Sequence, residues 1–179
     1  MFRTFTIKDY KMYIDLFETY VFPIINYCSF LYFGTSVRNI NELESILRYF
    51  TKRQYYRTKF RKTMLKVSYV DRLQIFSLKS IEHRLIVSEF CLFYKVIHGL
   101  IPLSSNDTIF SSRVPGRIRL SLSHTRIYHN FFLHRKRSLW NRLFPAGSNV
   151  QLSSFASFFK VVSELDLTGE YRGCALKAV

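Results

Sequence analysis

The fold class is decided by the stretch Ser80–Gly99, which reads SIEHRLIVSEFCLFYKVIHG. Ser80 belongs to the residue types that cap the start of a helix, and we expect a helix from there through His98. Gly99 stands where a helix commonly ends in the left-handed conformation, and Pro102 prevents the helix from resuming. The stretch therefore predicts one long helix with a defined start and end.

More helices are predicted toward the N-terminus. Residues 14–32 indicate a mostly buried helix in which Pro23 makes a kink or a reset. Asn39 is expected to start a second helix, because Asn39 and Glu42 have the spacing of a capping box. Ser68 can cap a shorter helix after it. One face of the second helix is marked by apolar residues at helical spacing, namely Ile40, Leu43, Ile46, Leu47 and Phe50.

Toward the C-terminus, we expect helices over 130–143 and 154–165. Residues 117–122 alternate apolar with basic or polar side chains, as a strand or an extended arm does. Together these patterns predict a mainly α fold, in which a helical bundle is followed by a smaller basic helical unit with room for one short β-hairpin. The expected division is a helical region over 1–102, a linker over 103–112, a basic helical region over 113–168 and a frayed tail over 169–179.

The composition narrows the class of protein. A chain of 179 residues holds one domain or two small ones. Its 48% hydrophobic and 17% aromatic residues exclude a disordered tail. The 27 Lys and Arg residues against 12 Asp and Glu give a net charge of +15, which predicts a polyanionic partner. The 3 cysteines form no CxxC pair, so we expect an intracellular protein, cytoplasmic or nuclear, that is not secreted.

One uncharged segment has the length of a membrane span. Residues 19–37 carry no charge over 19 positions. They also include Pro23, Asn26 and several small polar residues, with little Leu. We therefore expect a buried helix rather than a span, and no membrane partner.

Catalytic and metal-binding motifs are missing from the sequence. His129 and His134 are five residues apart, which does not fit the i, i+4 spacing of a shared metal on a helix. Cys91 lies among Phe90, Leu92 and Phe93 and is expected to be a core residue rather than a nucleophile. There is no GxSxG, Walker-type or GxGxxG pattern. We expect no catalytic residue, no metal site and no cofactor.

Two basic tracks are the candidate functional residues. Arg48 to Lys66 contains no acid and interleaves aromatic residues, and the second track lies in an acid-free stretch from Thr108 to Ser163. Dense cations neutralise phosphates, aromatic rings can stack on unpaired bases, and such binding is independent of sequence. A solvated helix face and loop is the alternative for both. The predicted contacts are Arg48, Lys52, Arg53, Arg57, Lys59, Arg61 and Lys62 in the first basic track, and Arg117, Arg119, Arg135, Lys136 and Arg137 in the second.

Six segments carry a pattern that recurs together in one order. Leu16–Cys28 reads LFETYVFPIINYC and is similar to LYxxYVxPILEYxS. The further segments are 43–53, 68–84, 93–100, 131–145 and 152–160, similar to LExVQRxFTRR, SYEERLxxLxLxSLExRR, xYKIxHGL, FFxxRvxxxWNxLP and SLxxFKxxL. Over roughly residues 15–165 the chain thus resembles the C-terminal, thumb and post-thumb, region of non-LTR (LINE-type) retrotransposon reverse transcriptases.

The resemblance implies a helical thumb-like bundle and a part of an RNA-directed DNA polymerase. In that family the palm supplies paired aspartates, which this sequence lacks. We therefore expect a fragment that does not polymerise alone, since palm and endonuclease domain would both be missing. Its implied partners are an RNA or DNA backbone and the palm and fingers of a parent polymerase. The alternatives are a helical interaction or membrane-associated protein that uses residues 16–33, and a relic reading frame without function.

Overall fold

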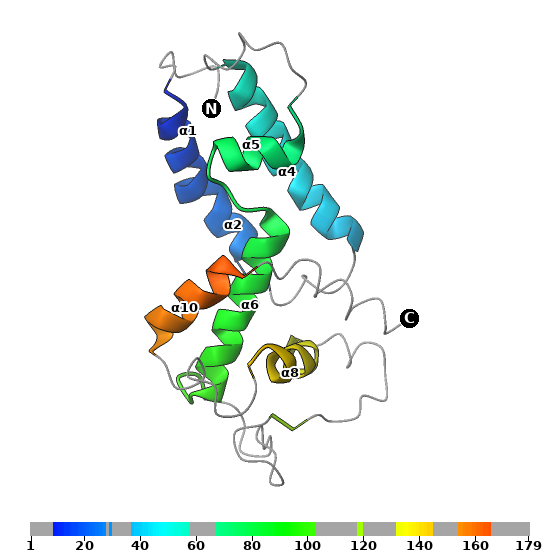
Figure 1. Cartoon of the computed structure of the whole chain (residues 1–179), viewed down its shortest axis with the longest axis vertical. Helices are drawn as coiled ribbons and strands as arrows, with labels where there is room; N and C mark the ends of the chain where they lie inside the picture. Colours follow the sequence, from blue (N-terminus) through cyan, green and yellow to red (C-terminus); the bar gives the residue numbers. More distant parts are fainter. Residues whose placement is uncertain are drawn as a thin grey trace. The chain divides into compact units, whose positions relative to one another are not determined.

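The computed structural model describes residues 9–27, 29, 37–57, 67–102, 118–119, 132–144 and 154–165. These residues are mainly α-helical, which confirms the predicted fold class (Figure 1). The chain divides into two compact units, one made of 1–27 and 38–81 and the other of 28–37 and 82–179. The predicted linker and tail lie outside the described residues, so the predicted domain division stays a prediction.

The first unit begins with three consecutive helical segments, α1 (Tyr10–Leu16), the π-helical η1 (Phe17–Val21) and α2 (Phe22–Asn26). The wide π turn comes directly before Pro23, and the Phe22 N–H bonds to the Phe17 carbonyl. Pro23 has no N–H for the next α-helical bond and its ring crowds the preceding turn, so the helix widens there and resumes. The predicted helix over 14–32 is interrupted, because Tyr27 leaves the helical conformation with ψ at 123°. Ser29 is helical again, and residues 30–32 lie outside the described part.

The long helix α4 spans Val37–Arg57. Asn39 therefore lies inside the helix and does not start it, and the Glu42 carboxylate pairs with Arg38 instead of closing a capping box. Leu47 and Phe50 are buried as predicted, but Ile46 is 43% exposed. The buried face continues instead through polar and aromatic residues: Glu44, Thr51, Gln54 and Tyr55.

Aromatic packing joins these helices within the first unit. The rings of Phe17 and Phe50 stack at 4.1 Å, so η1 packs on α4. The short helix α5 (Tyr69–Ile75) starts at Ser68, whose hydroxyl forms the predicted cap with Asp71 in a full capping box.

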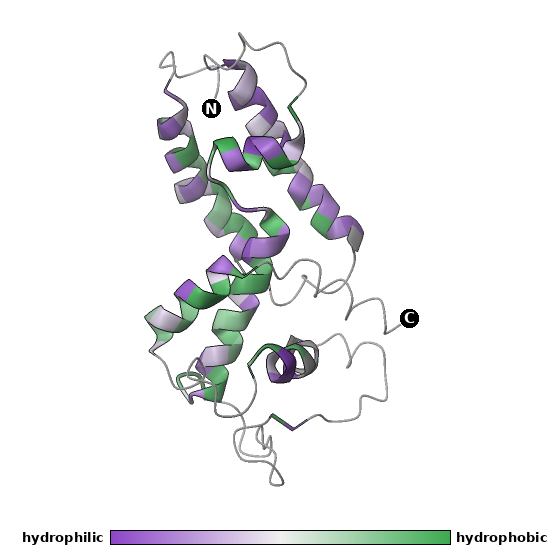
Figure 2. Cartoon of the chain, in the orientation of Figure 1, coloured by the Kyte–Doolittle hydropathy of each residue, from purple (hydrophilic) through white to green (hydrophobic). Residues whose placement is uncertain are grey.

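The second unit is built around α6 (Ile81–Ile97), which carries mostly hydrophobic residues, whereas α4 carries mostly hydrophilic ones (Figure 2). Its C-terminal end follows the prediction. Gly99 has a φ of +68°, and the N–H groups of Gly99 and Leu100 bond to the carbonyls of Val96 and Lys95. This is a Schellman motif, which satisfies two carbonyls at the helix end.

Two further helices complete the described part of this unit, α8 (Phe132–Leu143) and α10 (Phe155–Glu164), close to the bounds predicted. Trp140 is 1% exposed, as expected for a core residue. Its ring lies 5.4 Å from both the Phe93 and the Phe158 ring, so α8 packs against α6 and α10. Phe158 and Val162 form the buried face of α10.

Little of the predicted strand is described. Ile118 makes a single β-bridge, and its N–H and carbonyl both bond to the Asn141 side-chain amide, at 3.0 and 2.9 Å. The rest of the predicted hairpin lies outside the described residues. Within the described ranges, no helix is long and apolar enough to span a membrane.

Candidate nucleic-acid interface

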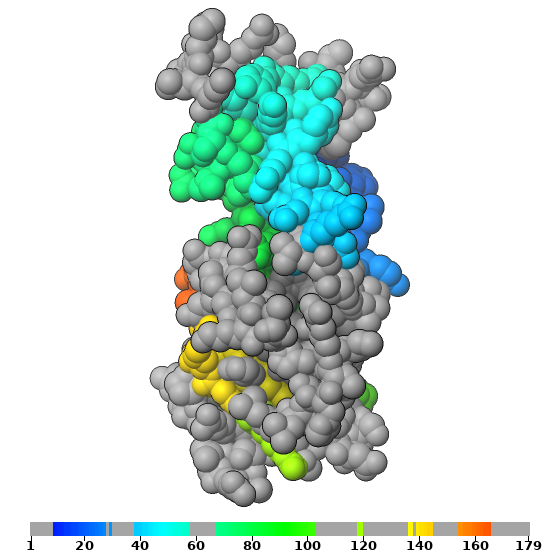
Figure 3. Space-filling view, turned by 90° about the vertical axis from the view of Figure 1, so that its right-hand side faces the viewer, coloured from blue at the N-terminus to red at the C-terminus, as the bar shows by residue number. Residues whose placement is uncertain are grey.

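The second half of α4 presents a cationic and aromatic face to solvent, which we call the α4 basic face. Arg48, Tyr49, Lys52, Arg53 and Tyr56 are all exposed. The residues between them point inward and are buried, because a helix with 3.6 residues per turn separates the two sets onto opposite sides. Figure 3 shows α4 at the surface of the molecule. Three of the seven predicted contacts of the first basic track, Arg48, Lys52 and Arg53, are therefore accessible to a partner.

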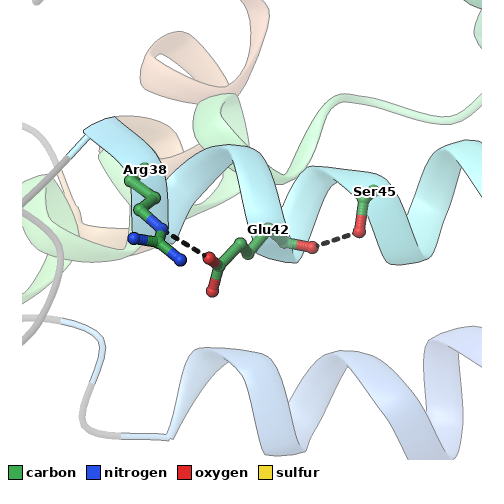
Figure 4. Close-up of polar contacts among 3 residues, drawn as sticks. All are labelled: Arg38, Glu42 and Ser45. Carbon is green, nitrogen blue, oxygen red and sulfur yellow. Dashed lines mark hydrogen bonds and ion pairs between the residues drawn. The ribbon is translucent and has the colours of Figure 1, made fainter.

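The acids of α4 do not compensate this charge. Glu42 is held at the other end of the helix, with its Oε1 2.9 Å from the Arg38 Nε, and Ser45 bonds to its carbonyl (Figure 4). Glu44 is 6% exposed. From Arg48 to Arg57 the helix has no acidic residue. Its exposed cations therefore act on a bound anion without an opposing carboxylate from the same helix.

The arginines of α4 lie on aromatic rings. The Arg48 guanidinium is 5.0 Å from the centre of the Tyr69 ring, and Arg72 approaches the same ring at 5.8 Å. Arg57 is half-buried, 5.2 Å from the centre of the Tyr13 ring. Such cation–π contacts hold a guanidinium in place while its donors stay available.

Glu44 fixes the ring that Arg48 contacts. The Tyr69 hydroxyl donates a hydrogen bond to Glu44 Oε1, and the Ile81 N–H donates to Oε2 at 2.9 Å. Burial, and then the bond to Glu44, raises the pKa of Tyr69 above its usual range. Tyr69 therefore stays neutral and bound to Glu44 at physiological pH. The sequence signal for this role is the position of Glu44, an acid on the apolar face of α4.

The remaining predicted contacts differ in whether the structure describes them and in how exposed they are. Lys59, Arg61, Lys62 and Arg117 lie outside the described residues, as does the Arg135 side chain. Arg119 is exposed. Lys136 and Arg137 are buried, at 0% and 7% exposure.

Lys136 is directed into the second unit instead of toward solvent. Its Nζ is 2.8 Å from Glu89 Oε2 and 4.6 Å from the centre of the Phe90 ring. A buried, paired ammonium cannot reach a phosphate, so the structure removes Lys136 and Arg137 from the second basic track. The sequence of α8 gave no sign of this, because the partner carboxylate belongs to α6.

Metal-ligating side chains do not gather in the described part of the chain. It holds no group of three or more His, Cys, Asp or Glu side chains that could bind a metal. Burial raises the pKa of the Cys91 thiol to about 11, so little nucleophilic thiolate forms at neutral pH. The side chain is half-buried and does not lie fully in the core as expected. The buried His83 ring has its Nε2 3.0 Å from the Leu165 carbonyl oxygen. The side chains of His129 and His134 lie outside the described part.

Comparison with known proteins gives one similarity. The chain is 31% identical over 99 residues to an uncharacterized protein, B0403.1, of Caenorhabditis elegans. The match covers 55% of this chain and 48% of that protein, so the chain spans about half the length of the curated relative it matches. No protein-family model and no solved structure matches the chain.

Proposed function

We propose that the chain is a thumb-like part of a non-LTR retrotransposon reverse transcriptase, and that it binds RNA or DNA through the phosphate backbone without catalysing a reaction itself. The six segments described above support the family origin. The α4 basic face supports the binding, and it carries the proposal. The palm and fingers of the parent polymerase would be the other partners.

The chemistry of the α4 basic face fits a phosphate backbone. Arg48, Lys52 and Arg53 are exposed within two turns of one helix, and no acid lies between them. Each phosphate that such cations neutralise releases condensed counterions, which makes binding weaken steeply with salt. Contacts to the phosphate backbone carry no sequence information, so we expect similar affinity for unrelated sequences.

The test is the salt dependence of binding to a labelled DNA duplex and to an RNA–DNA hybrid, followed by fluorescence anisotropy with the full chain. A plot of log affinity against log salt has a negative slope. The variant Arg48→Ala/Lys52→Ala/Arg53→Ala should make this slope shallower by about 0.9 for each phosphate contact that is lost. The matched control, Lys11→Ala/Lys79→Ala/Lys160→Ala, removes the same charge from other exposed positions. Equal slopes for the two variants, or no salt-dependent binding by the wild type, would contradict the proposal.

A second candidate function is a helical interaction protein, and one observation favours it. Tyr20, Ile24 and Tyr27 are 65%, 76% and 78% exposed, within eight residues of sequence at η1, α2 and the end of α2. Contiguous exposed apolar side chains mark protein or membrane contacts. A wild-type chain that needs detergent to stay in solution, and an Ile24→Glu variant that does not, would favour this function. Equal solubility of the wild type and the variant without detergent would oppose it.

A further inference from the structure

We propose that the α4 basic face prefers single-stranded to double-stranded nucleic acid, with Tyr49 and Tyr56 as the surfaces on which unpaired bases stack. The inference rests on the proposed function and names the form of nucleic acid that the same face binds. It is based on the difference in solvent exposure among the aromatic residues of α4. Tyr49 and Tyr56 are 60% and 53% exposed, while Phe50 and Tyr55 are 3% and 5% exposed.

The two exposed rings lie in line along the helix. Tyr49 and Tyr56 are seven residues apart, which is about two helical turns, or about 10 Å of rise on nearly the same side. Lys52 and Arg53 follow Tyr49 by three and four residues, so both cations fall between the rings on that side. The face thus alternates ring, cations and ring over a length that several nucleotides of a single strand can follow.

Contacts within α4 hold each ring in position. Arg53 Nη1 donates a hydrogen bond to the Tyr49 hydroxyl at 3.3 Å. The Tyr56 ring meets the buried Tyr55 ring nearly edge-on, with centroids 5.8 Å apart and planes at 80°. A side chain that is restrained before binding loses less conformational entropy when a ligand orders it. Both rings are therefore presented for stacking at low cost.

Single and double strands offer different groups to this face. Both supply phosphates to Lys52 and Arg53. In a duplex the base faces are already covered by neighbouring pairs, whereas a single strand leaves them free to stack on a tyrosine. The rings therefore add affinity for the single strand alone, and this added affinity is independent of salt because stacking releases no counterions.

The control residues are available in the same unit. Tyr20 and Tyr27 are as exposed as the two α4 rings. The sequence from Met12 to Tyr27 contains no Lys or Arg, so these rings have no cation from their own segment. They therefore match Tyr49 and Tyr56 in exposure and differ in the charge pattern that the inference requires.

The experiment measures binding of the full chain to labelled oligothymidylate, oligouridylate and a mixed-sequence duplex of the same length over a range of salt. We expect the wild type to prefer both single strands, and Tyr49→Ala/Tyr56→Ala to bind them at least about 25-fold more weakly, since stacking contributes about fivefold or more per ring. Duplex affinity and the salt slope should stay unchanged. Tyr49→Phe/Tyr56→Phe should retain the preference, and Tyr20→Ala/Tyr27→Ala should behave as wild type.

Other outcomes separate the two proposals. Equal wild-type affinity for single strands and duplex, or an equal loss of both in Tyr49→Ala/Tyr56→Ala, overturns the single-strand preference and leaves backbone binding standing. A preference for only one of the two single strands also overturns stacking as its cause, because either base has a face that a ring can cover. If no oligonucleotide binds, both proposals fail.

Discussion

The Glu44 carboxylate accepts the backbone N–H of Ile81 at 2.9 Å, across 37 residues of sequence. Ile81 is the first residue of α6, where backbone N–H groups have no partner within the helix and the helix dipole favours a negative charge. The other oxygen of Glu44 accepts the Tyr69 hydroxyl. One buried side chain of α4 thus joins α5 and the start of α6 within the first unit.

Replacing this carboxylate should destabilise the protein. Glu44→Ala leaves the Tyr69 hydroxyl and the Ile81 N–H without their acceptor, and we expect the free energy of unfolding to fall by about 2–3 kcal/mol in urea denaturation. Glu42→Ala is the control, because Glu42 is on the same helix but its ion pair is exposed, and it should cost about 0.5 kcal/mol or less. Similar losses of unfolding free energy in the two variants would show that the Glu44 hydrogen bonds stabilise the fold no more than an exposed ion pair does.

The buried ion pair of Lys136 and Glu89 makes a second prediction. Lys136→Met leaves the Glu89 carboxylate buried without its cation and should destabilise the chain by about 3–5 kcal/mol. Replacing both partners, Lys136→Met/Glu89→Met, should recover most of that loss, because neither charge of the pair then remains buried. Urea unfolding of Lys136→Met, Glu89→Met and the double variant measures the coupling. The exposed pair Arg38–Glu42 should show a coupling of about 0.5 kcal/mol or less in the same cycle.

A third prediction concerns two residues in the left-handed backbone region. Ser77 ends α5 with a φ of 53°, and Gly99 ends α6 with a φ of 68°. A side chain at this conformation is strained, so Ser77→Gly should stabilise the protein and Gly99→Ala should destabilise it, each by about 1 kcal/mol. A Cβ at Gly99 would meet nothing within 4 Å, so its cost comes from the backbone and not from a clash. Thermal unfolding should move the midpoint in opposite directions for the two variants.

Alkaline pH provides a fourth prediction. Burial raises the pKa of Cys91 from 9.0 to about 11, so between these values the unfolded chain loses a proton that the folded chain keeps. Stability should therefore be full below about pH 9 and fall as the pH rises toward 11. Cys91→Ala removes this contribution. Its unfolding free energy, measured at several pH values, should decline less than that of the wild type over this window, and parallel declines would contradict the assignment.

Several features followed from local sequence because their causes are local. Ser68 and Asp71 form a capping box with each other, and Gly99 ends α6 because it adopts the left-handed conformation without strain. By contrast, Asn39 was a poor guide to the start of α4, since Glu42, the partner that the capping box needs, instead pairs with Arg38.

The sequence by itself determined the helical class, several helix ends and the acid-free run of cations from Arg48 to Arg57, because periodicity, caps and charge are properties of neighbouring residues. Only the tertiary structure decided which charges reach solvent. Lys136 and Glu44 have ordinary positions in their own helices, yet each is buried against a group from a distant segment. Tyr49 and Tyr56 stay exposed beside Arg53 while Phe50 and Tyr55 are covered. Such sorting depends on which helices pack together, and no local pattern records it.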